Sequence, residues 1–293
     1  MKTYPGNKLI DRLYNAVAEK GHVCLGLDTD YSYLPDAFGT KFASPAEAVY
    51  AFNREVIDAT LDVSTVYKVQ IAYYEAMGLA GLDCYAKTLA YLREKKAIVI
   101  ADVKRGDIAK TAEMYAQAHF TGDFEADFIT VNPFMGMDTL KPFYPYLEKK
   151  DKGLFVLVAT SNPGANDIEG ILAADGESVS EKTGAMVAGE NAAFLGESGY
   201  GMIGAVVGCT NKNQTDRIRA RLENVFFLIP GYGAQGGKAE DMKYYFKDGN
   251  GGVVNSSRGI LLARNKPEFA HLSFAEAARA ECVRMREDIQ SAL

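Results

Sequence analysis

The segment Ile98–Ile108, IVIADVKRGDI, joins an apolar run to a cluster of charged residues. Because side chains alternate along a β-strand, Asp102 and Lys104 must lie on the same face of this segment. An ammonium group flanked by carboxylates keeps its proton, since opposite charges favour the ionised form. Such a lysine is suited to donating a proton, whereas a Schiff-base nucleophile requires a neutral amine. The spacing therefore predicts proton-donating chemistry at the end of a buried strand.

Two other apolar runs also have a charged residue at or near their end. Lys68 lies in VYKVQ and Asp28 closes CLGLD. One charge at a strand end is often simply solvated. Four charges on three neighbouring strands need pairing, because burying an unpaired charge costs several kcal/mol. The alternating signs of Asp28, Lys68, Asp102 and Lys104 supply that pairing, and we expect the four side chains to form one cluster.

The elements that must position these residues are eight short apolar runs, each typical of a strand. The runs are His22–Asp28, Ser64–Gln70, Ala97–Lys104, Phe128–Pro133, Leu154–Ser161, Met202–Thr210, Val225–Gly231 and Gly252–Ser257. Helical segments alternate with them, two of which begin with the capping-box patterns Ser44–Glu47 and Ser273–Glu276. This alternation favours a (β/α)8 TIM barrel. A doubly wound sheet is the alternative, but no G-x-G-x-x-G turn follows the first run.

The chain shows no linker, so we expect residues 1–293 to form a single (β/α)8 barrel domain. The N-terminal segment Met1–Gly21 has acidic residues inside its apolar pattern, which indicates a helix rather than a signal peptide. We expect this helix to cap the barrel bottom. The long irregular segment Ser161–Lys182 follows a strand, and it is either a surface excursion or a substrate loop.

Composition excludes several classes of protein. The net charge is −6 and no dense basic run is present, which argues against a nucleic-acid partner. The four cysteines are scattered without a C-x-x-C pair and the three histidines lie far apart, so we expect free thiols in a reducing cytoplasm and no zinc site. No run approaches the ~20 apolar residues that a membrane span requires.

Two segments near the C-terminus are suited to phosphate. Pro230–Gly237, PGYGAQGG, and Ser256–Ile260, SSRGI, follow the seventh and eighth runs. The loops at these positions often bind phosphate in barrels of this kind. Glycine-rich backbone lets N–H groups approach an anion, and the guanidinium fork of Arg258 matches a phosphate. The glycines alone would indicate only a tight turn, but beside Arg258 they favour a phosphate site.

With these residues in view, the chain resembles the orotidine 5′-phosphate decarboxylase family. DVKRGD fits the D-x-K-x-x-D signature of that family, and the order of Asp28, Lys68, ATSNPG, IPGYGAQGG and NSSRGI is similar to its longer bacterial-type branch. The resemblance implies decarboxylation of orotidine 5′-monophosphate to uridine 5′-monophosphate in de novo pyrimidine biosynthesis. It also implies that no cofactor or metal is needed, and that the protein is a homodimer with shared active sites.

The resemblance also implies residue roles. Lys104 matches the lysine that protonates C6 of the pyrimidine, and Asp102 matches the carboxylate beside the departing carbon dioxide. Lys68 and Asp107 complete a Lys–Asp–Lys–Asp chain, in which the family's last aspartate crosses from the neighbouring subunit. Whether Asp107 acts in its own or the partner's site stays open. The matched substrate-binding positions are Asp28 for ribose, Thr111 for the partner's site, Ser161 for the pyrimidine, and Gln235 and Arg258 for phosphate.

Three alternatives remain. A metal-dependent phosphosugar lyase or decarboxylase of the same barrel superfamily needs an additional carboxylate, commonly a glutamate, where this chain has Lys68. A Schiff-base aldolase would use Lys68 or Lys104, and the paired carboxylates argue against a neutral amine at either position. A non-catalytic nucleotide-binding relative is expected to have lost a member of the charged tetrad, and this sequence retains every member.

Overall fold

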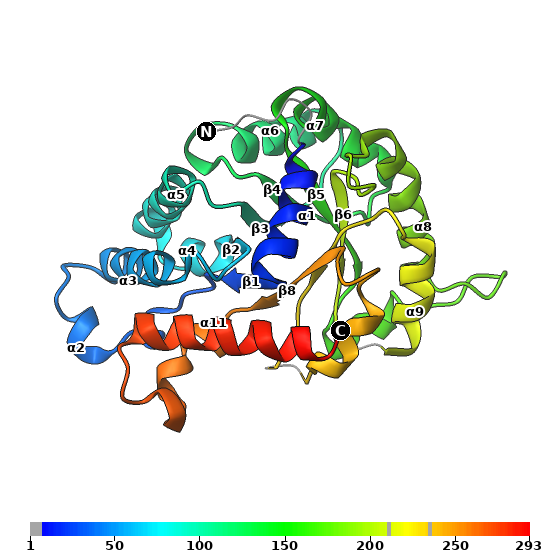
Figure 1. Ribbon diagram of the computed structural model, residues 1–293. Helices are drawn as coiled ribbons and strands as arrows, with labels where there is room; N and C mark the ends of the chain where they lie inside the picture. Colours follow the sequence, from blue (N-terminus) through cyan, green and yellow to red (C-terminus); the bar gives the residue numbers. More distant parts are fainter. Residues whose placement is uncertain (1–7, 210–211, 234–235) are drawn as a thin grey trace.

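The computed structural model describes residues 8–209, 212–233 and 236–293. Within them, parallel strands pair in sequence order and close into a barrel through β1 and β8 (Figure 1). The strands are β1 Val23–Gly26, β2 Val66–Gln70, β3 Val99–Arg105, β4 Phe128–Val131, β5 Gly153–Ala159, β6 Ile203–Val207, β7 Phe227–Ile229 and β8 Gly252–Ser256. The (β/α)8 barrel expected from the sequence is confirmed, and each predicted run contains one strand or nearly all of it.

Helices surround this barrel on the outside, except for α1, which lies across one end of it (Figure 1). They are α1 Leu9–Lys20, α2 Asp36–Gly39, α3 Pro45–Thr60, α4 Ile71–Glu75, α5 Gly78–Glu94, α6 Ala109–Phe120, α7 Tyr144–Lys150, α8 Val179–Asn191, α9 Lys212–Arg221, α10 Arg258–Leu261 and α11 Phe274–Ser291. The predicted capping box at Ser273 is complete and begins α11. At α3, Ser44 accepts from the backbone of Glu47, but the Glu47 carboxylate bonds the amide of Ala43 instead of closing the box.

The barrel interior is filled by aromatic side chains that lie over glycines of the next strand. Phe128 on β4 pairs with Gly153 on β5, and Phe155 on β5 pairs with Gly204 on β6. A β-carbon on either glycine would overlap the facing ring. Burying each ring stabilises the fold by roughly 1.5–3 kcal/mol. The packed interior thus gives the charged strand ends a rigid support.

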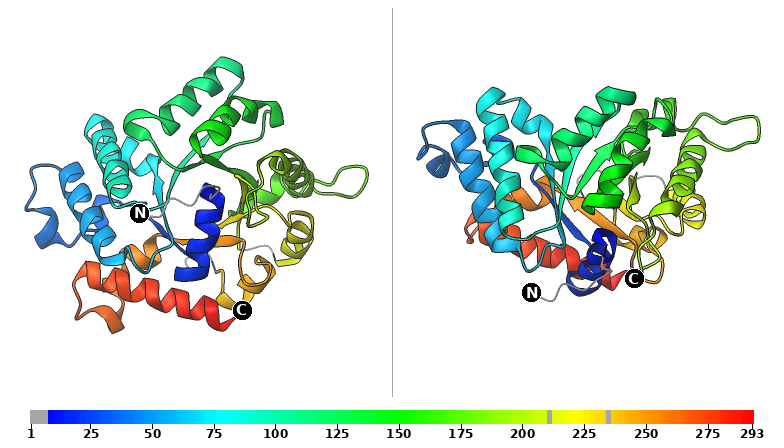
Figure 2. Two further views of the ribbon diagram at one scale, coloured as in Figure 1. Left: turned by 45° about the horizontal axis from the view of Figure 1, so that its top comes forward. Right: turned by 90° about the horizontal axis from the view of Figure 1, so that it is seen from above.

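The N-terminal helix α1 covers the barrel end opposite the carboxyl ends of the strands (Figure 2). The backbone amide of Leu9 donates to the Asp151 carboxylate at 2.7 Å, and Asp11 accepts from the amide of Ser198 at 2.8 Å. Asp151 precedes β5 and Ser198 precedes β6, so both contacts lie at the amino ends of strands. The predicted cap at the barrel bottom is confirmed.

The long segment between β5 and α8 projects from the barrel (Figure 2). Leu172 forms an isolated antiparallel bridge with Ser178, and the apolar residues Ile168, Ile171 and Leu172 are exposed. Most of the segment is therefore a surface excursion, and only its first residues approach the mouth of the barrel.

None of the helices in the described ranges has the combination of length and apolar character that crossing a bilayer demands.

Candidate active site

A cavity with two compartments opens at the carboxyl ends of the strands. The larger compartment, of ≈ 330 Å³, has mostly polar walls, and the smaller one, of ≈ 230 Å³, has several apolar walls. The walls of both include Lys68, Asp102, Lys104, Pro230 and Asn255. The charged residues of β2 and β3 therefore lie where the two compartments meet.

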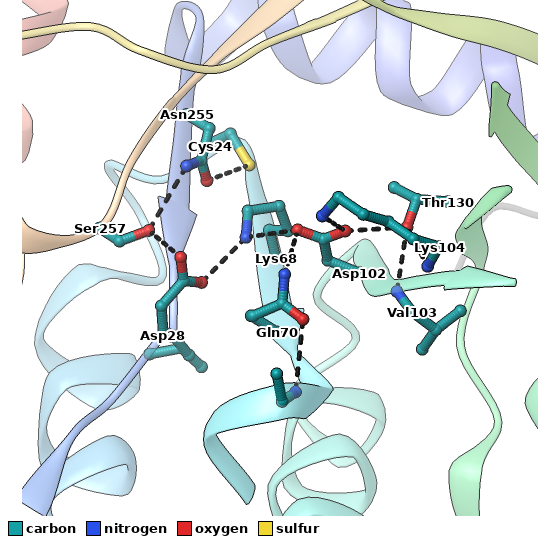
Figure 3. A network of polar contacts seen from close by, with 12 residues as sticks. Cys24, Asp28, Lys68, Gln70, Asp102, Val103, Lys104, Thr130, Asn255 and Ser257 are labelled. Carbon is teal, nitrogen blue, oxygen red and sulfur yellow. Dashed lines mark hydrogen bonds and ion pairs between the residues drawn. The ribbon is translucent and has the colours of Figure 1, made fainter. Parts of the chain in front are cut away.

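Lys68 is the buried cation of the site, on β2. Its Nζ donates to Oδ1 of Asp28 at 2.9 Å and to Oδ2 of Asp102 at 3.1 Å (Figure 3). Only 5% of its side chain is exposed. Burial by itself disfavours the ammonium, but the two carboxylates outweigh burial and raise the pKa of Lys68. Lys68 is therefore a fixed positive charge between two anions.

Asp102, near the end of β3, is the anion that the whole cluster surrounds. One carboxylate oxygen accepts from Lys104 at 2.6 Å and from Thr130 at 2.8 Å, and the other accepts from Lys68 and from Gln70 at 2.9 Å. Burial alone would raise its pKa, but the ammonium groups of Lys68 and Lys104 and the hydroxyl of Thr130 hold the pKa of Asp102 well below its ordinary value. The residue stays ionised and holds its neighbours in place.

Lys104 is the more accessible of the two lysines. Its side chain is 48% exposed, and its Nζ lies beside Asp102 at the boundary of the two compartments (Figure 3). Its backbone has φ of 44°, in the left-handed region that side chains other than glycine rarely adopt. The pairing of β3 with β4 also shifts register between Ala101 and Arg105. An irregular strand end thus presents an ammonium to the cavity.

The polar compartment carries the residues that the sequence assigned to ribose and phosphate. Asp28 accepts from the hydroxyl of Ser257 at 2.9 Å, and Arg258 and Gly231 line the same compartment. Gly231 has φ of 102°, a conformation that glycine adopts without strain. Gln235 lies outside the described residues. A guanidinium and a glycine-containing loop therefore face the polar compartment, and neither Gly231 nor Arg258 lines the apolar one.

The apolar compartment holds Ser161, the residue matched to the pyrimidine. Its other walls are the side chains or backbone of Thr130, Leu157, Thr160, Asn162, Val206 and Leu228, beside the five residues shared with the polar compartment. Thr160 is held by Glu169, which accepts from its amide at 2.8 Å and from its hydroxyl at 2.7 Å. The base of the projecting excursion thus shapes this wall. The compartment suits a flat, weakly polar ring with one or two hydrogen-bonding groups.

Asp107 and Thr111 are not brought into the cluster. Asp107 follows β3, and its carboxylate accepts from the amide of Ile108 at 2.8 Å. Thr111 is exposed in the first turn of α6. Among the residues that the structure describes, neither lines either compartment. Both lie on the outer rim beside the loops that follow β3.

Three polar residues complete the cluster without having been selected from the sequence. They are Gln70 and Thr130, which donate to Asp102, and Ser257, which donates to Asp28. Alternation along β2 places Gln70 on the same face as Lys68, so the sequence pattern could have predicted that Gln70 joins the cluster. Thr130 has the same periodicity signal on β4, but nothing in its neighbours separates it from an ordinary strand threonine. Ser257 belongs to the segment Ser256–Ile260, whose hydroxyls and guanidinium the sequence assigns to phosphate, but its hydroxyl donates to Asp28 instead.

Comparison with known proteins agrees with this geometry. The family model described as orotidine 5′-phosphate decarboxylase / HUMPS family matches residues 21–271. The orotidine 5′-phosphate decarboxylase of Clostridium acetobutylicum is 57% identical over 285 residues, covering 97% of this chain and 100% of the relative. That of Clostridium perfringens is 55% identical, with 97% and 99% covered.

A solved structure agrees as well. The OMP decarboxylase of Leishmania donovani superposes with a TM-score of 0.76 at 28% identity, covering 97% of this chain and 98% of that one. The match to the family model spans most of the barrel, and the relatives match at nearly full length. The chain therefore belongs to the orotidine 5′-phosphate decarboxylase / HUMPS family.

Proposed function

We propose that this protein converts orotidine 5′-monophosphate to uridine 5′-monophosphate and carbon dioxide in de novo pyrimidine biosynthesis. The observation that carries the proposal is the position of Lys104. Its ammonium adjoins Asp102 and lies at the junction between a compartment lined by Arg258 and a compartment lined by Ser161. A nucleotide with its phosphate in the first compartment and its base in the second would bring C6 to this junction.

In the proposed mechanism, the bond between C6 and the carboxylate carbon breaks and its electron pair remains on C6. Lys104 Nζ then gives a proton to C6, forms a C–H bond and becomes a neutral amine, which regains a proton from solvent. A preorganised ammonium stabilises the developing carbanion without reorganising at the moment of reaction. Lys68 stays protonated throughout, because two carboxylates lie within 3.1 Å of its nitrogen.

Asp102 has two proposed roles. Its anionic form orients both lysines, and it lies next to the position of the substrate carboxylate. The like-charge contact disappears as carbon dioxide leaves, so it favours the transition state over the bound substrate. The phosphate is remote from the reacting bond, and contacts of Arg258 with it supply binding energy that holds the base in register.

The metal-dependent phosphosugar reaction is less consistent with the site. In that reaction a cation would have to bind among carboxylates near the mouth of the barrel. Here Nζ of Lys68 lies between Asp28 and Asp102, at 2.9 Å and 3.1 Å. A divalent cation at the same position would meet a like charge at short range. The relatives named above are also orotidine 5′-phosphate decarboxylases.

The direct test is a spectrophotometric assay of the purified full-length chain with orotidine 5′-monophosphate, in the presence of EDTA. We expect the absorbance of the substrate to be lost at the same rate with and without the chelator. Borohydride added during turnover should trap no adduct. Failure to consume the substrate would contradict the proposal, and activity abolished by EDTA and restored by a divalent cation would favour the phosphosugar alternative.

We further infer that the protein is a homodimer whose active sites are shared. The support is a set of exposed apolar side chains on the segments after β2, β3 and β4, two of which, Ile108 and Met114, are close in sequence to Asp107 and Thr111. These side chains are Leu79, Ile108, Met114, Phe134 and Met135. Phe134 is 82% exposed, which is unusual for a large ring that has no partner to cover it.

Subunit mixing tests this assembly. Lys104→Ala and Asp107→Ala are each expected to be inactive, since each removes one member of the proposed charge chain. If Asp107 acts across the interface, a mixed dimer contains one intact site, and equal mixing should restore about a quarter of wild-type activity by random pairing. If the two variants carry different affinity tags, and the mixed dimers isolated on both tags in succession are inactive, Asp107 acts in its own subunit's site.

We infer the location of the protein in the cell from its cysteine thiols. Cys24, Cys84, Cys209 and Cys282 are all free and buried. Burial raises the pKa of the Cys84 and Cys209 thiols to about 12, so these groups are unreactive at neutral pH. We infer a cytoplasmic location, where free thiols of this kind are ordinary. Fractionation of cells that express the chain, with detection by antibody, is the corresponding measurement.

A further inference from the structure

Thr130, on β4, is buried beside the end of β3 (Figure 3). Its hydroxyl accepts from the backbone amides of Val103 and Lys104, both at 2.9 Å, and donates to Oδ1 of Asp102 at 2.8 Å. A hydroxyl has one donor and two acceptor positions. The Thr130 hydroxyl therefore uses all three hydrogen-bonding positions on consecutive residues of β3. These residues include Asp102 and Lys104, which we propose to act on the substrate.

The end of β3 needs such a partner because it leaves the regular ladder. Ala101 pairs with Ile129, but the next pair joins Arg105 to Val131, so β3 has extra residues opposite Thr130. The amides of Val103 and Lys104 bond a side-chain oxygen at this point. Lys104 also has a positive φ of 44°, a conformation that persists only when the surroundings hold it.

We propose that Thr130 is a positioning residue for decarboxylation, whose hydroxyl fixes the backbone of Lys104 and the carboxylate of Asp102 so that the ammonium is presented to C6. The inference rests on the roles proposed above for Lys104 and Asp102. Thr130 acts through these two residues. Without its hydroxyl, the two amides lose their acceptor, and one oxygen of Asp102 retains Lys104 alone as its donor.

A positioning role predicts an effect on kcat that a merely structural role does not predict. Misplacing a reacting group by about 1 Å can cost about 100-fold in rate while leaving remote binding contacts intact. Asp28 and Arg258, proposed to contact ribose and phosphate, follow the ends of β1 and β8, away from the β3–β4 junction. Loss of the Thr130 hydroxyl should therefore appear in kcat and spare the binding of the nucleotide.

The decisive variant is Thr130→Val, which removes the hydroxyl at nearly constant shape. We expect kcat for orotidine 5′-monophosphate to fall about 10- to 100-fold, with KM and the affinity for uridine 5′-monophosphate changed by less than about threefold. Thr130→Ser keeps the hydroxyl and should recover kcat to within about threefold of wild type. Hydrogen exchange of residues 98–108 should be faster in Thr130→Val than in Thr130→Ser.

Thr60→Val is the matched control. Thr60 is also a fully buried threonine, and its hydroxyl bonds the carbonyl of Val56 at 2.7 Å and the hydroxyl of Tyr67 at 2.8 Å. It ends α3 and precedes β2, at the barrel end opposite the cavity. Thr60→Val should lower the melting temperature and leave kcat unchanged. This control separates lost stability from lost positioning.

Several outcomes would overturn the inference. They are a wild-type kcat in Thr130→Val, a Thr130→Ser variant as slow as Thr130→Val, or a Thr60→Val variant that loses as much kcat as Thr130→Val. Should Thr130→Val not fold, Thr130→Ala carries the same comparison with Thr130→Ser. If Lys104→Ala is inactive while Thr130→Val is normal, only this inference fails. Full activity in Lys104→Ala would overturn the proposed mechanism together with it.

Discussion

Replacing Lys68 by methionine measures how strongly the buried ion pairs hold the site together. Nζ of Lys68 lies 2.9 Å from Asp28 and 3.1 Å from Asp102, and its side chain is 5% exposed. Methionine fills a similar volume without the charge. Removing one partner of a buried pair costs about 3–5 kcal/mol, because the remaining charges are left without compensation. We therefore expect Lys68→Met to lower the free energy of unfolding by about 3–5 kcal/mol at neutral pH.

The loss should shrink as the pH falls. In the wild type, burial alone would raise the pKa of Asp102, and Lys68 and Lys104 together reverse that effect. Without Lys68, burial and the charge of Asp28 push the pKa of Asp102 upward. A carboxyl whose folded-state pKa lies above its unfolded value destabilises the fold at higher pH, and the penalty disappears once it takes up a proton. The difference from wild type should be larger at about pH 8 than at about pH 5.

Urea unfolding followed by circular dichroism measures both effects, at one fixed protein concentration because assembly alters apparent stability. Lys104→Met is the matched control, since Lys104 bonds the same carboxylate at 2.6 Å but is 48% exposed. An ion pair with such an exposed partner contributes at most about 1 kcal/mol. The electrostatic reasoning is refuted if Lys68→Met is no more destabilising than Lys104→Met, or if its effect is independent of pH.

Three further predictions concern activity and acid stability. Lys104→Ala should abolish turnover in the absorbance assay while its circular dichroism spectrum stays native, and substantial residual decarboxylation would contradict its role. Arg258→Ala should weaken uridine 5′-monophosphate binding about tenfold or more in calorimetry, because charge-assisted hydrogen bonds contribute about 1.5–3 kcal/mol, and unchanged affinity would refute the phosphate assignment. Burial, followed by the charge of Arg105, lowers the pKa of His119 to about 4. The unfolded chain therefore takes up this proton first, so His119 should contribute a loss of about 3 kcal/mol between about pH 6.5 and pH 4, in addition to that from His22, whose pKa burial also lowers to about 4. His119→Gln should flatten that part of the urea-unfolding profile, and an unchanged slope would be inconsistent with this assignment.

The barrel and the charged cluster were predictable because each depends on local pattern. Alternation along β3 fixes the common face of Asp102 and Lys104, and the parallel order of β1, β2 and β3 brings Asp28 and Lys68 to the same rim. The network in Figure 3 matches that expectation. The strand limits were less predictable, since apolar runs continue past the last ladder pair into the loops.

Other features depend on contacts that no local pattern records. The positive φ of Lys104 and the shifted register of β3 arise from the meeting of β3 and β4, and Thr130 has its role only through that meeting. The predicted roles of Asp107 and Thr111 require a second subunit, and a single chain leaves them on the rim. The excursion after β5 carries no signal that distinguishes its base at Ser161, which lines the cavity, from its projecting tip.

At Lys104, selection for folding stability and selection for catalytic rate favour different residues. A residue with φ of 44° is one where glycine relieves strain of about 1 kcal/mol or more. Selection for thermal stability alone would thus favour Lys104→Gly, which replaces the whole side chain, including its ammonium, by a hydrogen atom. Directed-evolution libraries screened only by heat should lose this lysine early, whereas libraries screened by growth without added uracil should keep it despite the strain.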